Sequence, residues 1–208
     1  MARVQVTPDP FTLVQYEAGV IAGLTEELAA RVGVADDVPI AVEVDEELPL
    51  PLTGMTADVL DGKAVLWFSG ANFEDHHRQA QMSEQLTRAD LAISLFRVAD
   101  RLGAGFADAP VDEELTDAQR QAWESWAEGR ADRLGEFSRK VRRQYHFRLY
   151  NGFTDTADAA FERLWTADAD AFTWADLDAL VAECAAVDPR PKPKERAAIR
   201  KETLKPAG

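Results

Sequence analysis

The chain of 208 residues has few of the side chains that most often carry out chemistry, with three histidines and one cysteine. It contains no G-x-S-x-G, G-x-x-x-x-G-K or G-x-G-x-x-G segment. These absences disfavour hydrolases with a nucleophile elbow and the common nucleotide-binding folds, so no catalytic residue is assigned. The lone Cys184 cannot form an intramolecular disulfide, which fits a reducing cytoplasm. We expect it to be a small buried apolar residue on a C-terminal helix.

Long apolar runs are also missing from the chain. No stretch of about 18 apolar residues occurs, so nothing in the sequence predicts a membrane-spanning helix. The segment from Met1 to Val6 lacks the apolar region of a secretory signal. The sequence therefore predicts a cytoplasmic protein that does not bind a membrane.

Negative charge is in excess, and it is unevenly distributed. The net charge is −14, yet residues 188–208 contain seven basic and three acidic residues, which leaves 16 basic and 34 acidic residues, a charge of −18, in residues 1–187. Such a body repels nucleic acid and anionic lipid. We therefore expect a protein partner rather than nucleic acid, with the oligomeric state left open. Alternating prolines at 189–193 predict a flexible tail that either solubilises the chain or acts as a basic arm.

Hydrophobic periodicity predicts an α+β fold. Residues 40–44 alternate as in a half-buried strand, and Asp61-Gly62 between residues 56–60 and 64–69 indicates a hairpin with a type I′ turn. A first strand is predicted at 4–6, helices at 11–32, 87–102, 116–134, 137–149, 154–165 and 173–186, and a polar loop at 74–85. Helix N-terminal caps are predicted at Thr87 with Asp90, Thr116 with Gln119, and Thr173 with Asp176.

These elements predict a small N-terminal sheet of three or four strands packed on two long helices, followed by a helical C-terminal half. A single α+β domain would span residues 1–187, with a sheet-bearing half at 1–110 and a helical half at 111–187. The Pro-, Lys- and Arg-rich tail at 188–208 would follow it. Trp123 and Trp126, three residues apart on one predicted helix, are expected in the core.

The order helix, strand, hairpin and helix over residues 9–106 resembles the minimal arrangement of zincin-like metallopeptidases. In that family, the helix after the sheet carries H-E-x-x-H, whose histidines bind zinc and whose glutamate activates water. Here Phe96, Arg97 and Asp100 occupy the positions of that motif, and a Leu-Gly-x-Gly run follows at 102–105. Phenylalanine cannot bind zinc and arginine cannot act as a base. The resemblance therefore implies a relative without peptidase activity.

A second resemblance is carried by Phe147-Arg148, by residues 151–155 (Asn-Gly-Phe-Thr-Asp) and by residues 161–165 (Phe-Glu-Arg-Leu-Trp). These segments are similar to an uncharacterised protein family of high-G+C Gram-positive bacteria. That resemblance implies no activity.

The densest group of potential metal ligands is Glu74-Asp75-His76-His77. Adjacent histidines point in different directions on a helix or a strand, so one ion rarely binds both. A divalent-metal site would need His76 or His77 together with Asp75 and a distant partner such as His146 or Asp100. The alternative interpretation is a solvated polar loop after the hairpin and a protein without a cofactor.

Residues 137–149 are predicted to form an amphipathic helix with a basic outer face. Four apolar residues recur at every fourth position and are expected to face the core: Phe137, Val141, Tyr145 and Leu149. The candidate partner-binding residues are the cations of this segment: Arg139, Lys140, Arg142, Arg143 and Arg148. We expect them to pair with carboxylates of the fold or of a partner, because nucleic-acid binding would need a wider positive surface.

The sequence favours a non-catalytic interaction or accessory protein, with the degenerate zincin-like fold that the first resemblance implies. The acidic body and the basic segments favour this function, and no catalytic motif is intact. The alternative is a metal-dependent hydrolase built on Asp75, His76, His77 and His146.

Overall fold

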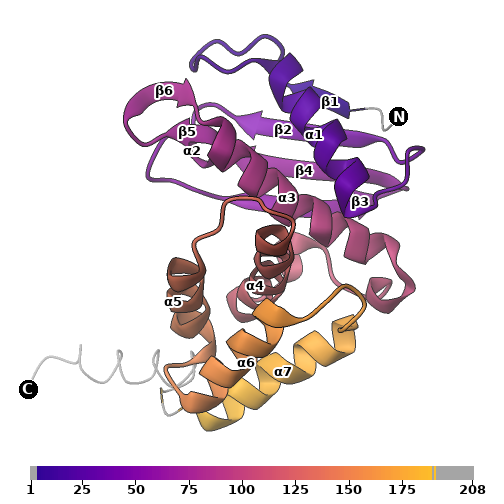
Figure 1. Ribbon diagram of the computed structural model, residues 1–208, viewed down its shortest axis with the longest axis vertical. Helices are drawn as coiled ribbons and strands as arrows, with labels where there is room; N and C mark the ends of the chain where they lie inside the picture. Colours follow the sequence, from indigo (N-terminus) through magenta and orange to yellow (C-terminus); the bar gives the residue numbers. More distant parts are fainter. Residues whose placement is uncertain (1–3, 189, 191–208) are drawn as a thin grey trace, which may run out of the picture.

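The computed structural model describes residues 4–188 and Arg190. The chain has the predicted α+β fold, with a four-stranded sheet in its N-terminal half and mostly helices after it (Figure 1). Most of the predicted tail, namely residues 189 and 191–208, lies outside the described residues. Within the described part of the chain, no helix combines the length and the apolar character that crossing a membrane requires.

The N-terminal sheet is mixed. Its strands are β1 (Val4–Thr7), β2 (Ile40–Asp45), β3 (Met55–Leu60) and β4 (Lys63–Ser69). They lie in the order β1-β2-β4-β3, with β1 and β4 parallel to β2 and β3 antiparallel to β4. The predicted type I′ turn is confirmed, because φ is positive at both Asp61 (51°) and Gly62 (76°).

Two long helices cover one face of the sheet (Figure 1). They are α1 (Ala18–Val32) and α3 (Glu84–Leu102). Leu28 of α1, Leu66 of β4 and Leu91 of α3 are fully buried between these layers. Burying a leucine side chain stabilises the folded state by about 1.5–3 kcal/mol, so this aliphatic layer is a major source of stability.

The segment before α1 is not helical, although the sequence predicted a helix from residue 11. The Glu46 carboxylate accepts hydrogen bonds from the main-chain nitrogen atoms of Thr12 (2.8 Å) and Leu13 (2.7 Å). These bonds hold the segment outside the helix and leave Leu13 60% exposed. The helix therefore begins only at Ala18.

A small hairpin occupies the segment that was predicted to be a loop. The elements are α2 (Gly70–Phe73) and the paired strands β5 (Glu74–Asp75) and β6 (Arg78–Met82). α3 then begins at Glu84 with Ser83 as its N-cap. The predicted cap of Thr87 with Asp90 is therefore wrong. Thr87 lies one turn inside the helix, where its hydroxyl donates to the Ser83 carbonyl oxygen (2.9 Å).

Between residues 111 and 188, the chain forms four longer helices. They are α4 (Asp117–Arg133), α5 (Lys140–Asn151), α6 (Asp155–Thr166) and α7 (Trp174–Val187). The predicted capping boxes at Thr116 with Gln119 and at Thr173 with Asp176 are both present. Cys184 is buried on α7, as expected from the sequence.

An aromatic core lies among these helices and differs from the aliphatic core under the sheet. Trp123 and Trp126 are buried, as predicted, and the ring of Phe106 stacks on both at centroid distances of 4.7 and 5.7 Å. At Gly129, a Cβ atom would lie 2.3 Å from the carbonyl oxygen of Trp165. Glycine at this position therefore allows α4 and α6 to approach closely.

Buried ion pairs join the two halves. Arg97 on α3 is fully buried and pairs with Asp112, which is also fully buried and pairs with Arg101 (2.8 Å). On the next turn of α3, Asp100 pairs with Arg130 of α4 (2.6 Å). Arg97 and Asp100, which were compared with the zincin motif, therefore hold α3 against its neighbours.

The orientation of α5 differs from the prediction. Four apolar side chains that were predicted to be buried are 37, 83, 54 and 39% exposed, respectively: Phe137, Val141, Tyr145 and Leu149. The side chain that enters the core is Phe147, whose ring centroid lies 5.8 Å from that of Phe161. The helix begins at Lys140, and Arg143 turns inward because two carboxylates of α4 bind it.

Candidate functional site

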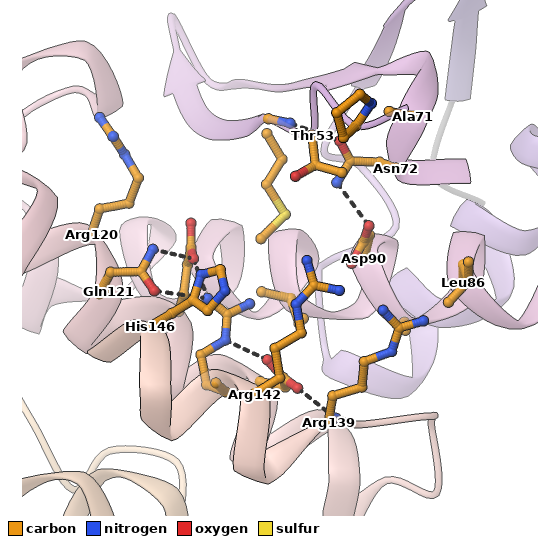
Figure 2. Close-up of a pocket in the computed structure, with 18 of the residues that line it drawn as sticks. Thr53, Ala71, Asn72, Leu86, Asp90, Arg120, Gln121, Arg139, Arg142 and His146 are labelled. Atoms are coloured by element: carbon orange, nitrogen blue, oxygen red, sulfur yellow. Dashed lines mark hydrogen bonds and ion pairs between the residues drawn. The ribbon is translucent and has the colours of Figure 1, made fainter. Parts of the chain in front are cut away.

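A cleft of about 680 Å³ lies where α3, α4 and α5 meet the loop before β3. Both of its main walls carry charged side chains, and apolar residues such as Met55, Leu86 and Ile93 also line it. Figure 2 shows Asp90 and Asn72 on one side of the cleft and Arg139 and Arg142 reaching into it from the other. A cleft of this size can hold a small organic molecule.

Asp90 is held in place by a chain of hydrogen bonds. Asn72 donates from Nδ2 to Oδ2 of Asp90 (2.8 Å). The side-chain oxygen of Asn72 accepts from the main-chain nitrogen of Gly54 (3.0 Å) and from the hydroxyl of Ser69 (2.8 Å). These two bonds fix the amide, so Asn72 presents a donor to Asp90.

The pKa of Asp90 is raised to about 6, mainly because burial disfavours the charged carboxylate. The nearby carboxylates of Glu124 and Glu128 raise the pKa further, whereas the Asn72 hydrogen bond and the charge of Arg143 lower it. Asp90 therefore titrates just below neutral pH, and its ionised form predominates at pH 7.

Arg143 is fully engaged by the fold. Its guanidinium lies between Glu124 and Glu128, which are one turn apart on α4, and binds both. The side chains of these three residues are only 15, 7 and 7% exposed. Breaking a pair buried to this extent leaves an uncompensated charge, which is strongly destabilising. Arg143 is therefore a structural residue that fixes one wall of the cleft.

Arg139 and Arg142 are in a different situation. Among the residues that the structure describes, no carboxylate forms an ion pair with either guanidinium. The main-chain nitrogen of Arg139 donates to Glu128 (2.9 Å), and its guanidinium lies 5.2 Å from the ring centroid of Phe137. Both arginines line the cleft, so two guanidinium groups are available to an anionic ligand.

The remaining predicted partner-binding cations have carboxylate partners on α6. Lys140 pairs with Glu162 (2.7 Å), and Arg148 pairs with Asp158. Of the five cations predicted to bind a partner, Arg139 and Arg142 are thus the two whose guanidinium groups no described carboxylate neutralises.

The predicted metal ligands are brought together only in part. His76 and His146 both line the cleft. The Asp75 carboxylate accepts instead from Arg78 (2.8 Å) and from the main-chain nitrogen of exposed His77 (2.8 Å). Over the described part of the chain, no group of three His, Cys, Asp or Glu side chains is arranged to hold a metal ion. Burial and the charges of nearby arginines lower the pKa of His146, so its imidazole is neutral at pH 7.

An exposed apolar strip runs along the outer side of α5, next to the cleft. Its members, which we call the α5 stripe, are Val141, Tyr145, Leu149 and Phe153. The rings of Tyr145 and Phe153 lie 6.0 Å apart, so the stripe continues past the end of the helix. α5 itself contains no acidic residue. All the charged side chains of α5 beside this apolar stripe are therefore cationic.

The cleft also contains polar residues that were not predicted as site residues, among them Asn72, Asp90, Glu124 and Glu128. Glu124 and Glu128 are four residues apart on a helix, which places both carboxylates on one face, and this spacing could have found them. Asp90 was assigned to a helix cap. Nothing local in the sequence marks Asn72, whose role depends on the contact between α2 and α3.

Comparisons of the chain with protein-family models, with curated proteins and with solved structures found no match. The function proposed below is therefore argued from the chain's own residues.

Proposed function

We propose that the chain is a non-catalytic interaction protein of the cytoplasm that binds an acidic partner protein on the outer face of α5. The observation that carries this proposal is the α5 stripe, which exposes four large apolar side chains at 39–83%. Contiguous exposed apolar surface of this kind marks interaction sites in soluble proteins. Aromatic side chains such as Tyr145 and Phe153 are favoured as anchors in such sites.

Charge argues for the kind of partner. Arg142 lies next to Val141 in sequence, and no described carboxylate pairs with it, so an acidic side chain of a partner can bind it. A second copy of this chain is a poorer partner. A two-fold symmetric contact would place the stripe and its arginines against themselves, so like charges would meet. We therefore favour an amphipathic acidic segment of another protein.

The alternative function, a metal-dependent hydrolase, has less support from the described residues. Of its four proposed ligands, the structure brings His76 and His146 to the cleft, while the Asp75 carboxylate binds Arg78. The α5 stripe instead concerns apolar side chains that remain 39–83% exposed in the described structure.

The proposal can be tested with a photoreactive phenylalanine analogue at position 145, crosslinked in the cells that produce the protein. A matched analogue at Ala182, an exposed position on α7, serves as the control. We expect position 145 alone to capture an acidic protein, which is then purified. Its affinity should fall at least tenfold with Val141→Ala plus Tyr145→Ala, because interface anchors each contribute more than about 1 kcal/mol.

The control for the affinity measurement is Leu60→Ala, an apolar residue that is 49% exposed at the β3–β4 hairpin. It should leave binding unchanged. Equal affinity of the stripe variant and the wild type, capture at both positions, or capture of only a second copy of this chain would contradict the proposal.

A further inference from the structure

Unpaired charges of opposite sign face the same cleft. Oδ2 of Asp90 accepts from Asn72, and no donor among the described residues reaches Oδ1. Arg139 and Arg142 line the cleft, as Asp90 does, but neither forms an ion pair with it. The carboxylate and the guanidinium groups are thus separated by the cleft instead of neutralising each other (Figure 2).

The other charges of the cleft are already paired. Arg143 binds both Glu124 and Glu128, and Arg120 pairs with Asp117 (3.2 Å). What remains for a ligand is one carboxylate and two guanidinium groups. A purely anionic ligand would meet the charge of Asp90, and a purely cationic ligand would meet the two arginines. A ligand with both charges avoids either repulsion.

We propose that this cleft binds a small dipolar molecule, with its carboxylate or phosphate between Arg139 and Arg142 and its ammonium group on Asp90. The chemical class is that of amino acids and amino phosphates whose two charges are separated by a short apolar body. Arginine suits the acidic end because its guanidinium binds carboxylate or phosphate with two parallel hydrogen bonds. Met55, Leu86 and Ile93 provide apolar wall for the segment between the charges.

This site is separate from the α5 stripe, although both border α5. The stripe consists of outward-facing apolar side chains, whereas Asp90 and Asn72 belong to α3 and α2. The inference goes beyond the proposed function. Both use Arg142, but Asp90 and Asn72 take no part in the proposed function, so the test at Asp90 separates the two.

The proposal predicts a particular pH dependence. An ammonium group favours ionised Asp90, whose pKa is about 6 in the free protein. Binding of a dipolar ligand should therefore weaken as the pH falls from 8 to 5.5, by roughly fourfold from the change in Asp90 ionisation. The affinity for an anion without an amine should instead rise as the pH falls, because protonation of Asp90 removes a repulsive charge. The other charged or titratable groups that line the cleft with Asp90 are His76, Asp117, Arg120, Glu124, Glu128, Arg139, Arg142, Arg143, His146 and Tyr150.

The test uses calorimetric titration of the full chain with two series of probes. One series is the ω-amino acids from 4-aminobutanoate to 8-aminooctanoate, and the other is the plain carboxylates from butanoate to octanoate. We expect one ω-amino acid length to bind at least about tenfold more tightly than the carboxylate of equal length at pH 7.5, since only the ammonium group can form a charge-assisted hydrogen bond to Asp90. The best length measures the separation of the two charged groups.

Two variants assign the ends of the ligand. Asp90→Asn should abolish the advantage of the amine and remove the part of the pH dependence that Asp90 causes. A pH dependence that remains in this variant comes from another group, such as His146. Arg142→Gln should weaken both series. The matched control is Arg78→Gln, which removes one positive charge from a side chain that is 63% exposed on the β5–β6 hairpin, and it should change neither.

Several results would overturn the inference. One is the absence of binding of every probe up to about 10 mM. Another is equal affinity for the ω-amino acid and the plain carboxylate of each length. The third is a tighter binding of the amine that remains in Asp90→Asn. The thermal unfolding midpoint of each variant shows whether a loss of binding comes from misfolding. Because these probes do not contact the α5 stripe, failure here leaves the partner-binding result unaffected.

Discussion

The sheet-bearing half and the helical half are held together by different kinds of interaction. Under the sheet, aliphatic side chains such as Leu28, Leu66 and Leu91 fill the core. In the helical half, aromatic rings fill the core, and arginine–carboxylate pairs lie along its borders. The guanidinium of Arg130 even lies 3.8 Å from the ring centroid of Trp126. Apolar patterning is therefore a reliable guide to the first half and an incomplete guide to the second.

The largest loss of stability should come from breaking the ion pair between Arg97 and Asp112, which joins the two halves. Arg97→Met keeps most of the side-chain volume but leaves Asp112 without one of its two arginine partners in a fully buried position. We expect a loss of about 3–5 kcal/mol in the free energy of unfolding, as for other broken buried pairs. Urea denaturation measures it, with Arg78→Met on the exposed hairpin as the control. A loss below about 1 kcal/mol would show that charge pairing does not hold this border.

A second comparison concerns the two faces of α5. Arg143→Met should destabilise the fold by about 2–4 kcal/mol, because it leaves the carboxylates of Glu124 and Glu128 close together without a cation. Tyr145→Ala should cost less than about 1 kcal/mol, since Tyr145 is 54% exposed. Urea denaturation of both variants decides the order. The reverse order would mean that the apolar side of the helix is its buried side.

A change of opposite sign, smaller than that of either charge-pair variant, should come from the cleft. The pKa of Asp90 is raised to about 6 in the folded protein, so ionising this group on folding is unfavourable. That cost is absent below about pH 4 and is fully present above pH 6, so stability falls as the pH rises through this window. Asp90→Asn should therefore gain about 1–2 kcal/mol at pH 7, allowing for water in the cleft.

The check on this prediction is urea denaturation of the wild type and Asp90→Asn at pH 4 and pH 7. The two proteins should have nearly equal stability at the lower pH. If the variant were less stable at pH 7, the carboxylate would have a stabilising partner, and the ligand-binding role of Asp90 would lose its basis.

Local signals in the sequence predicted much of the fold. The Asp61-Gly62 turn and the capping boxes at Thr116 and Thr173 were confirmed, because each depends on residues within a few positions of each other. The starts of α1 and α3 were not predicted correctly. The start of α1 depends on Glu46, which is more than 30 residues away in sequence from Thr12 and Leu13.

The candidate site was the part least visible in sequence. The arginines at 139 and 142 were identified, as were His76 and His146 of the cleft, but Asp90 was assigned to a helix cap. Its actual surroundings come from α2, α4 and α5, which no spacing within α3 can show.

By itself, the sequence determined the periodicity of its helices and strands, the turn between β3 and β4, and the acidic charge of the body. Only the tertiary structure decided which face of α5 is buried. Its apolar and basic residues both recur at helical spacing, so either face could have turned inward. The two buried carboxylates of α4 decided it. A buried carboxylate needs a cation beside it, and Arg143 binds both of them while the α5 stripe stays in solvent.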